Sequence, residues 1–272
     1  MNFKDKLEKI IKENNSLLCI GLDPAFGKMP KKILKKKNSI FEFNKSIINE
    51  TADIVCSYKP QFAFYASRGL DGIKALIQTI AYVHHQYPKI PVILDAKRGD
   101  IGSTAEQYAE EIFDVYSADA VTVNPFLGFD SLKPFLERKD KGIIVLARTS
   151  NPGASDFQDL KINISPLYIK IAEKVVAWHK IYKNCLMVVG ATWPQQLKEI
   201  RDIANDMFFL IPGVGAQRGD LKNTLKYGLT KQKSGLIISA SRSIIFASKE
   251  RDFAKQARRE AIKLKEEINT YR

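Results

Sequence analysis

The sequence predicts an α/β fold, a closed (β/α)8 TIM barrel with one extra N-terminal helix at residues 2–14. Apolar, β-branched runs alternate with segments of helical periodicity, which is typical of a parallel sheet with helical connections. About eight such units follow one another, which favours a closed barrel over an open sheet. The length of 272 residues suits a single barrel, and no Pro/Gly/Ser-rich linker divides the chain. Residues 1–272 are therefore expected to form one domain.

The predicted strands are short apolar runs, and most of them are followed by polar residues. The eight strands are expected at residues 16–22, 54–58, 91–94, 118–123, 142–147, 186–189, 208–211 and 235–239. Helices are expected between them, for example at 72–86, 166–180 and 194–204. Another helix is predicted to begin at Ser103, which has capping-box spacing with Glu106. Because barrel enzymes act at the carboxyl ends of their strands, the polar residues there are the first candidates for a site.

The charge pattern and the hydropathy of the chain argue against a nucleic-acid partner and against a membrane partner. The formal net charge is +13. Much of it lies in the runs 28–37 and 249–265, which lack the interleaved aromatic residues that stack on bases, so no nucleic-acid partner is predicted. A positive field still favours a multiply anionic small substrate. No apolar run approaches the roughly 18 residues that span a membrane, and the charged N-terminus lacks a signal-peptide core, so no membrane association is predicted.

The cysteines and histidines predict neither a redox centre nor a metal site. The three cysteines lie far apart in apolar runs, so we interpret them as buried, reduced thiols of a cytoplasmic protein: Cys19, Cys56 and Cys185. The three histidines are interpreted as surface or packing residues of helices. The sequence also has no P-loop, no dinucleotide fingerprint and no metal-ligand cluster. We therefore expect no metal and no cofactor.

The most informative stretch runs from Asp95 to Ala105 and reads Asp-Ala-Lys-Arg-Gly-Asp-Ile-Gly-Ser-Thr-Ala. It follows the apolar run 90–94, so charged side chains come directly after a buried strand. Asp95 and Lys97 are two positions apart and should point to the same side of that strand. One interpretation is a solvated loop with an incidental ion pair. The other is a catalytic lysine that two carboxylates keep cationic and that can donate a proton.

A second cluster predicts a phosphate site. The loop after the seventh predicted strand reads Pro-Gly-Val-Gly from Pro212 to Gly215, and the loop after the eighth carries Arg242. Loops at these two places commonly hold phosphate in barrels, since glycines let backbone amides approach the anion. Arg242 can offer two parallel hydrogen bonds, and Gln217 a neutral donor. For the glycines alone, an ordinary turn is the alternative.

The eleven-residue stretch resembles the signature of the orotidine 5′-phosphate decarboxylase family, and in particular its longer bacterial and protozoan branch. The shorter D-x-K-x-x-D pattern is shared with related enzymes that act on sugar phosphates. The resemblance extends from Gly21 to Arg242, nearly the whole predicted barrel. It implies a cofactor-independent carboxy-lyase that converts orotidine 5′-monophosphate to uridine 5′-monophosphate and CO2, the last step of de novo pyrimidine synthesis.

The resemblance also implies roles for individual residues. Lys97 would stabilise negative charge at C6 of the substrate and then protonate that carbon. Asp95, Asp100 and Lys59 would form an alternating charge network with it. Ser150 matches a serine that hydrogen-bonds the pyrimidine, although Thr149 and Asn151 are alternatives for that contact. The residues assigned to substrate binding are Asp23, Thr104, Ser150, Pro212, Gln217 and Arg242.

A homodimer is also implied by the resemblance. Asp100 and Thr104 match residues that reach into the neighbouring subunit's site, so two composite sites are expected. The nearest alternative function is a sister enzyme on the same barrel, a 3-keto-gulonate-phosphate decarboxylase or hexulose-phosphate synthase, which uses a similar motif with magnesium. A basic nucleic-acid-binding protein is a more remote alternative, motivated by the charge of +13. It would leave the charged strand ends unexplained.

Overall fold

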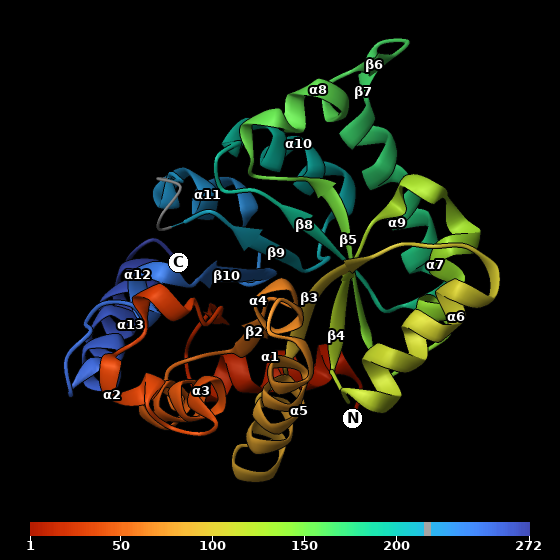
Figure 1. Ribbon diagram of the computed structural model, residues 1–272. Helices are drawn as coiled ribbons and strands as arrows, with labels where there is room; N and C mark the ends of the chain where they lie inside the picture. Colours follow the sequence, from red (N-terminus) through yellow and green to blue (C-terminus); the bar gives the residue numbers. More distant parts are fainter. Residues whose placement is uncertain (215–218) are drawn as a thin grey trace.

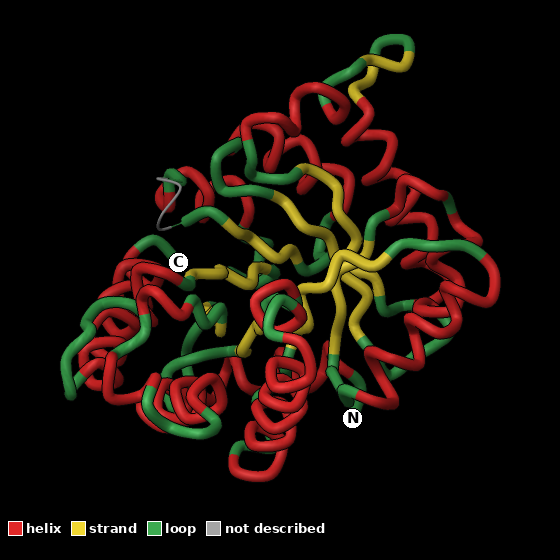
Figure 2. Tube along the Cα trace, in the orientation of Figure 1, coloured by secondary structure: helices red, strands yellow, loops and turns green. Residues whose placement is uncertain are grey.

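Eight parallel strands form the centre of the molecule, and helices surround them (Figures 1 and 2). The computed structural model describes residues 1–214 and 219–272. Hydrogen-bonded neighbours follow the order β2-β1-β10-β9-β8-β5-β4-β3. Two isolated parallel bridges, Tyr58 to Val92 and Gln61 to Asp95, join β2 to β3 and bring the two ends of the sheet together. The predicted (β/α)8 barrel is confirmed.

All eight predicted strands are present, at Leu18–Leu22 (β1), Ser57–Pro60 (β2), Ile93–Arg98 (β3), Ala120–Val123 (β4), Gly142–Arg148 (β5), Cys185–Val189 (β8), Phe209–Pro212 (β9) and Leu236–Ala240 (β10). The second and third were predicted too early, at 54–58 and 91–94. Both strands continue through charged residues, so an apolar run does not show where they end. These charged residues can lie in the strands because they form ion pairs with one another. A short antiparallel hairpin, β6 (Lys161–Ile162) and β7 (Ser165–Pro166), was not predicted.

The helices are α1 (Phe3–Glu13), α2 (Lys31–Leu34), α3 (Ser39–Thr51), α4 (Ala63–Ala66), α5 (Gly69–Gln86), α6 (Gly102–Glu110), α7 (Phe129–Leu136), α8 (Ser155–Gln158), α9 (Leu167–Tyr182), α10 (Pro194–Ala204), α11 (Leu221–Gly228), α12 (Arg242–Ile245) and α13 (Phe253–Thr270). The predicted capping box at Ser103 is wrong. Helix α6 begins one residue earlier, its N-cap is Ile101, and no side chain caps it. Gly102, with φ of +53°, makes the turn into the helix, so Ser103 already lies inside the first turn.

Helix α1 confirms the predicted extra N-terminal helix. It buries Phe3, Leu7, Ile10 and Ile11, an amphipathic pattern that turns one face toward the barrel. Phe3 lies so close to Gly142, the first residue of β5, that a methyl group at that glycine would collide with the Phe3 ring. The helix therefore packs against the amino-terminal end of the barrel, beneath the strands in Figure 1.

The strands supply most of the hydrophobic core. Every residue of β1 and of β8 is buried. The three cysteines are free thiols and buried, as predicted from their apolar surroundings. None of the helices in the described part of the chain is both long and apolar enough to cross a membrane.

Candidate active site

The carboxyl ends of β2 and β3 bring three of the predicted site residues into one ion-paired chain. The Lys59 ammonium lies 3.0 Å from Oδ2 of Asp95, and the Lys97 ammonium lies 2.6 Å from Oδ1 of the same carboxylate. The Lys59 side chain is only 8% exposed, whereas that of Lys97 is 44% exposed. One carboxylate thus bridges a buried lysine and a lysine that is open to ligand. With all three groups ionised, the cluster carries one net positive charge.

The environment keeps the buried pair ionised. Burial alone would raise the pKa of Asp95, but the charges of Lys59 and Lys97 and their hydrogen bonds outweigh it and hold that pKa well below its usual range. Burial likewise opposes the charge of Lys59, and the carboxylates of Asp95 and Asp23 outweigh it, so the pKa of Lys59 lies above its ordinary value. Asp95 is therefore an anion that can hold Lys97 throughout the physiological pH range.

A pocket of about 400 Å³ opens above this cluster. Its volume is in the range of small-molecule sites. Besides Lys59, Asp95 and Lys97, the lining includes two further predicted site residues, Ser150 and Pro212. The rest is a mixture of polar and apolar groups: Thr122, Leu146, Thr149, Asn151, Gly153, Ala154, Phe157, Gln158, Val188 and Leu210. A ring-shaped polar ligand could place apolar faces against Leu146, Val188 and Leu210.

The loop after β5 covers one side of the pocket. Some of its polar side chains are hydrogen-bonded within the protein and others are not. The Thr149 hydroxyl donates to Asn151 at 2.7 Å and accepts from Gln158 at 2.9 Å. Within residues 1–214 and 219–272, the Ser150 hydroxyl has no hydrogen bond, although its carbonyl accepts one from Thr192. Among the three neighbouring candidates, Ser150 is the one whose side chain makes no hydrogen bond to the described residues.

Arg148, a polar residue at the end of the fifth predicted strand to which no role was assigned from the sequence, anchors that loop. It is the last residue of β5 and fully buried. Its guanidinium donates to Asp159 at 3.0 Å and to Gln158 at 3.3 Å, and it stacks on the Trp193 ring at 4.4 Å. A buried arginine needs such partners, because an unpaired charge is costly to bury. The available signal was an arginine directly after the apolar run 143–147.

Thr122, on β4, was missed. Its hydroxyl donates to Oδ1 of Asp95 at 2.8 Å and accepts from the backbone N–H of Lys97 at 3.0 Å. The only sequence signal was a hydroxyl side chain within an apolar strand, and that signal does not show which residues the strand will face.

Two further residues assigned to substrate binding, Asp23 and Arg242, lie at the carboxyl ends of β1 and β10. Asp23 follows β1, and its Oδ1 is buried without a hydrogen-bond partner among the described residues. Arg242 begins helix α12 after β10 and is exposed. The ends of β1 and β10 are close, since a methyl group at Gly21 would lie 2.7 Å from Cβ of Ser241. Gln217 lies outside the described residues.

Asp100 and Thr104 do not join the pocket of their own chain. The Asp100 carboxylate accepts a hydrogen bond from the next backbone N–H, that of Ile101, at 2.8 Å. Thr104 is exposed on α6. Neither lines the pocket that contains Lys97. The predicted contribution of these two side chains to an active site is therefore not seen within one copy of the chain.

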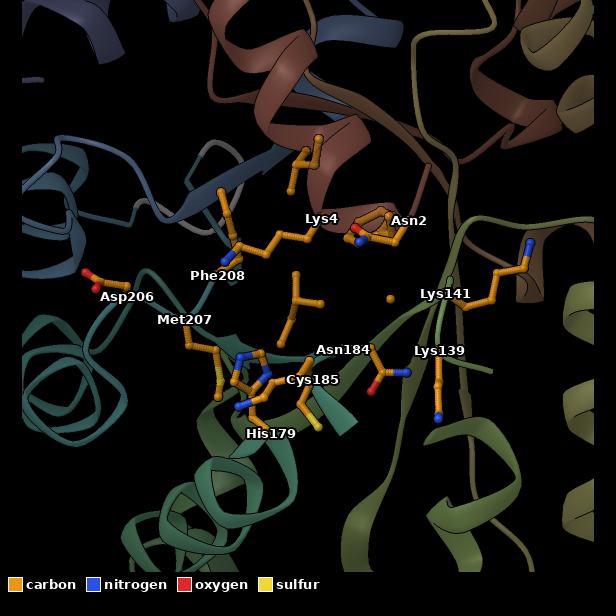
Figure 3. Close-up of a pocket in the computed structure, with 15 residues that line it drawn as sticks. Asn2, Lys4, Lys139, Lys141, His179, Asn184, Cys185, Asp206, Met207 and Phe208 are labelled. Carbon is orange, nitrogen blue, oxygen red and sulfur yellow. The ribbon is translucent and has the colours of Figure 1, made fainter. Parts of the chain in front are cut away.

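Another pocket lies at the opposite end of the barrel, between α1 and the beginnings of β5, β8 and β9 (Figure 3). Its described lining contains none of the predicted site residues. Two of its lysines, Lys139 and Lys141, point away from its centre in Figure 3. In barrel enzymes the amino-terminal end serves stability and the carboxyl end carries the chemistry. We therefore take the pocket at Lys97 as the candidate active site.

Together, the closed barrel and the Lys–Asp–Lys cluster at its carboxyl end define the class of protein, a TIM-barrel enzyme with a cationic centre for a small molecule. The family model described as "Orotidine 5'-phosphate decarboxylase / HUMPS family" matches residues 16–257. An orotidine 5′-phosphate decarboxylase of Cellvibrio japonicus is 52% identical over 274 residues, with 100% of both chains covered. The chain belongs to the orotidine 5′-phosphate decarboxylase / HUMPS family.

Solved structures of this family are also similar to the chain. The OMP decarboxylase of Leishmania donovani is 38% identical with a TM-score of 0.88, and the match covers 100% of this chain and 99% of that one. The UMP synthase of the same organism is 39% identical with a TM-score of 0.90. This chain spans 56% of that longer protein.

Proposed function

We propose that this chain decarboxylates orotidine 5′-monophosphate to uridine 5′-monophosphate and CO2, the last step of de novo pyrimidine synthesis, without a cofactor. The observation that carries the proposal is the Lys97 ammonium, held 2.6 Å from Asp95 and exposed to a pocket of about 400 Å³ in a chain of this family. A cytoplasmic location is part of the proposal, and the three buried free thiols fit a reducing compartment.

The chemistry follows from where the charge develops. When the bond between C6 and the carboxylate carbon breaks, CO2 leaves and the electron pair stays on C6. The cationic Lys97 stabilises this negative charge and then transfers a proton from Nζ to C6, which completes the product. Asp95 keeps Lys97 in place, and Lys59 on the other side keeps Asp95 ionised. Lys97 recovers its proton from water when the product has left.

Substrate binding is assigned to the residues around the cluster. Ser150, whose hydroxyl has no bond within the described residues, hydrogen-bonds the pyrimidine, and Asp23 and Lys59 contact the ribose. Pro212, Gln217 and Arg242 surround the phosphate. The phosphate is remote from the reacting carbon, so its binding energy can be used to hold the ring against Lys97.

Arg242→Ala should raise KM for orotidine 5′-monophosphate by about 10- to 100-fold and change kcat less, because a charge-assisted contact to the phosphate is lost. Steady-state kinetics check this, with Arg259→Ala on the exposed face of α13 as the control. The unphosphorylated nucleoside orotidine should be decarboxylated equally by the variant and the unaltered chain. An unchanged KM would place the phosphate elsewhere.

The proposal includes a homodimer in which Asp100 and Thr104 complete the partner's site. Both lie outside their own pocket, and the large apolar side chains of Ile101, Phe126 and Leu127 are exposed on the loops nearby, at 58%, 83% and 47%. Exposed apolar groups beside charged ones are typical of a surface that another chain covers. In such a dimer, Asp100 would be the second carboxylate beside Lys97.

Mixing two inactive variants tests this arrangement. Lys97→Ala and Asp100→Ala should each lose most activity alone. After subunit exchange in equal amounts, about a quarter of the sites should combine an intact Lys97 with an intact Asp100, and activity should return to about that fraction. Activity that stays at the sum of the two separate variants, although mass spectrometry shows mixed dimers, would contradict shared sites.

The function itself is tested by following the loss of orotate absorbance in the ultraviolet, with and without EDTA. We expect turnover of orotidine 5′-monophosphate that EDTA leaves unchanged. Turnover that EDTA abolishes, on a sugar phosphate such as 3-keto-gulonate 6-phosphate, would instead identify the magnesium-dependent sister enzyme. No turnover of orotidine 5′-monophosphate by well-folded protein would exclude the proposed function.

A further inference from the structure

Strand β3 does not pair regularly with β4 at the place where it carries the charged residues. Ile93 and Leu94 pair in register with Ala120 and Val121, and pairing resumes only at Arg98 with Val123. Three residues of β3, numbers 95–97, therefore lie opposite a single residue of β4, which is Thr122. A bulge of this kind leaves backbone groups without their ladder partners and redirects side chains.

Lys97 has a backbone conformation that L-residues rarely adopt. Its φ is +48°, in the left-handed region that costs a non-glycine residue energy and persists only where neighbouring contacts impose it. The contact that meets the Lys97 backbone here is the Thr122 hydroxyl, which accepts the Lys97 N–H at 3.0 Å. The same hydroxyl donates to Oδ1 of Asp95 at 2.8 Å, and that oxygen accepts from the Lys97 ammonium at 2.6 Å.

These three hydrogen bonds close a ring that begins and ends on one residue. It runs from the Lys97 backbone N–H to Thr122, on to Asp95 and back to the Lys97 ammonium. Thr122 is 1% exposed, so water has little access to replace its hydroxyl. One buried hydroxyl thus fixes both the backbone of Lys97 and the carboxylate that holds its side chain.

We propose that Thr122 is a positioning residue for the decarboxylation, which aligns the Lys97 ammonium with the reacting carbon through this ring of hydrogen bonds. The inference rests on the proposed function, in which Lys97 is the proton donor. Thr122 lines the pocket, but its hydroxyl is used by protein groups on both sides, so it acts through Lys97 and Asp95. Its removal should therefore affect the chemical step more than substrate binding.

The test compares three variants. Thr122→Val keeps the shape of the side chain but removes the hydroxyl, which leaves the Lys97 N–H without an acceptor. We expect kcat to fall by about 10- to 100-fold, as for a small misplacement of a reacting group, with KM within about threefold. Thr122→Ser keeps the hydroxyl and should restore kcat to within about threefold of the unaltered chain. Thr79→Val, which removes a similarly buried hydroxyl on α5 that donates to Ala75, is the matched control and should keep full activity.

A measurement that does not depend on turnover separates this inference from the proposed function. In protein labelled with 15N-lysine, the Lys97 amide signal is identified by its loss in Lys97→Arg, and its hydrogen exchange is followed by NMR. Thr122→Val should speed this exchange by at least about tenfold, and Thr122→Ser should not. If the unaltered chain lacks activity, the function is wrong, and the exchange still decides whether Thr122 holds Lys97.

Two kinetic outcomes would overturn the inference. One is a normal kcat in Thr122→Val. The other is an equal loss of kcat in Thr122→Ser and Thr122→Val, since the serine retains the hydroxyl on which the ring depends. Unchanged exchange of the Lys97 amide in Thr122→Val would likewise show that the hydroxyl does not hold this backbone.

Discussion

Lys97→Ala should lower kcat for orotidine 5′-monophosphate by about 10⁴-fold or more, because the variant loses the group that we propose both stabilises charge at C6 and donates the proton. The fold should survive this change. Asp95 keeps its buried partner Lys59 and the hydrogen bond from Thr122. The backbone of an alanine at position 97 can make the same contacts as that of the lysine. Turnover measured from the orotate absorbance, beside circular dichroism and dimer mass, separates the chemical effect from unfolding.

Lys198→Ala is a suitable control for that experiment. Lys198 lies on the exposed face of α10, and its one ion pair within residues 1–214 and 219–272 is with Asp202 of the same helix at 2.8 Å, so its loss should leave turnover unchanged. Near-normal turnover in Lys97→Ala would remove this lysine from the mechanism. A loss of turnover accompanied by unfolding would instead assign Lys97 a structural role.

Asp95→Asn should cost both activity and stability. The amide cannot neutralise Lys59, whose side chain is 8% exposed, so a buried ammonium would lose the carboxylate that pairs with it. Breaking a buried ion pair in this way typically costs about 3–5 kcal/mol of unfolding free energy. Turnover should fall by orders of magnitude as well, because Lys97 loses the carboxylate that orients it. Urea unfolding and the ultraviolet assay measure the two effects on the same protein.

Asp53→Asn provides the matched comparison. Asp53 pairs with Arg258 at the surface, where its side chain is 62% exposed, and such pairs contribute about 0–1 kcal/mol. Its loss should therefore be nearly neutral for stability and activity. Equal stability of Asp95→Asn and Asp53→Asn would contradict the importance of the buried cluster.

The pH dependence of stability should report the same ion pair. The pKa of Asp95 is lowered in the folded protein, so its contribution is present above its unfolded pKa of about 4 and is lost as pH falls toward the folded value. The pKa of Lys59 is raised, so its contribution is complete below about pH 10 and is lost as pH rises through the folded value. Asp95→Asn should flatten the acid side of this profile.

The alternation of apolar runs with helical segments was enough to predict the barrel, because buried parallel strands must be apolar and helices must cover them. The sequence also predicted that Asp95 and Lys97 lie together, because two residues that are two positions apart on one strand are close neighbours. The end of β2 could not be predicted, since Lys59 is buried only by virtue of a partner 36 residues later in the chain. Thr122 was missed, and Arg148 was assigned no role, for the same reason: their partners lie on other strands or loops.

The family resemblance selected Asp23 and Ser150, which local patterns alone would not have singled out, whereas Arg242 was also predicted from its place in the loop after the eighth strand. The structure places them at the carboxyl ends of β1, β5 and β10, but their contacts with a ligand remain proposals. Asp100 and Thr104 are a different case. Their roles depend on a second chain, and neither the sequence pattern nor the geometry of one chain determines what lies opposite them.

The sparse junction between β2 and β3 has a consequence for how the molecule would lose activity on heating. In the described part of the chain only isolated bridges join these strands, one of them at Asp95, whereas every other neighbouring pair has at least two consecutive residues in register. The least cooperative seam of the barrel therefore runs through the cluster of Lys59, Asp95 and Lys97. Local opening there separates Lys59 from Asp95 while the rest of the barrel stays folded. Inactivation should thus precede global melting, and a ligand that spans the seam would protect the enzyme against both.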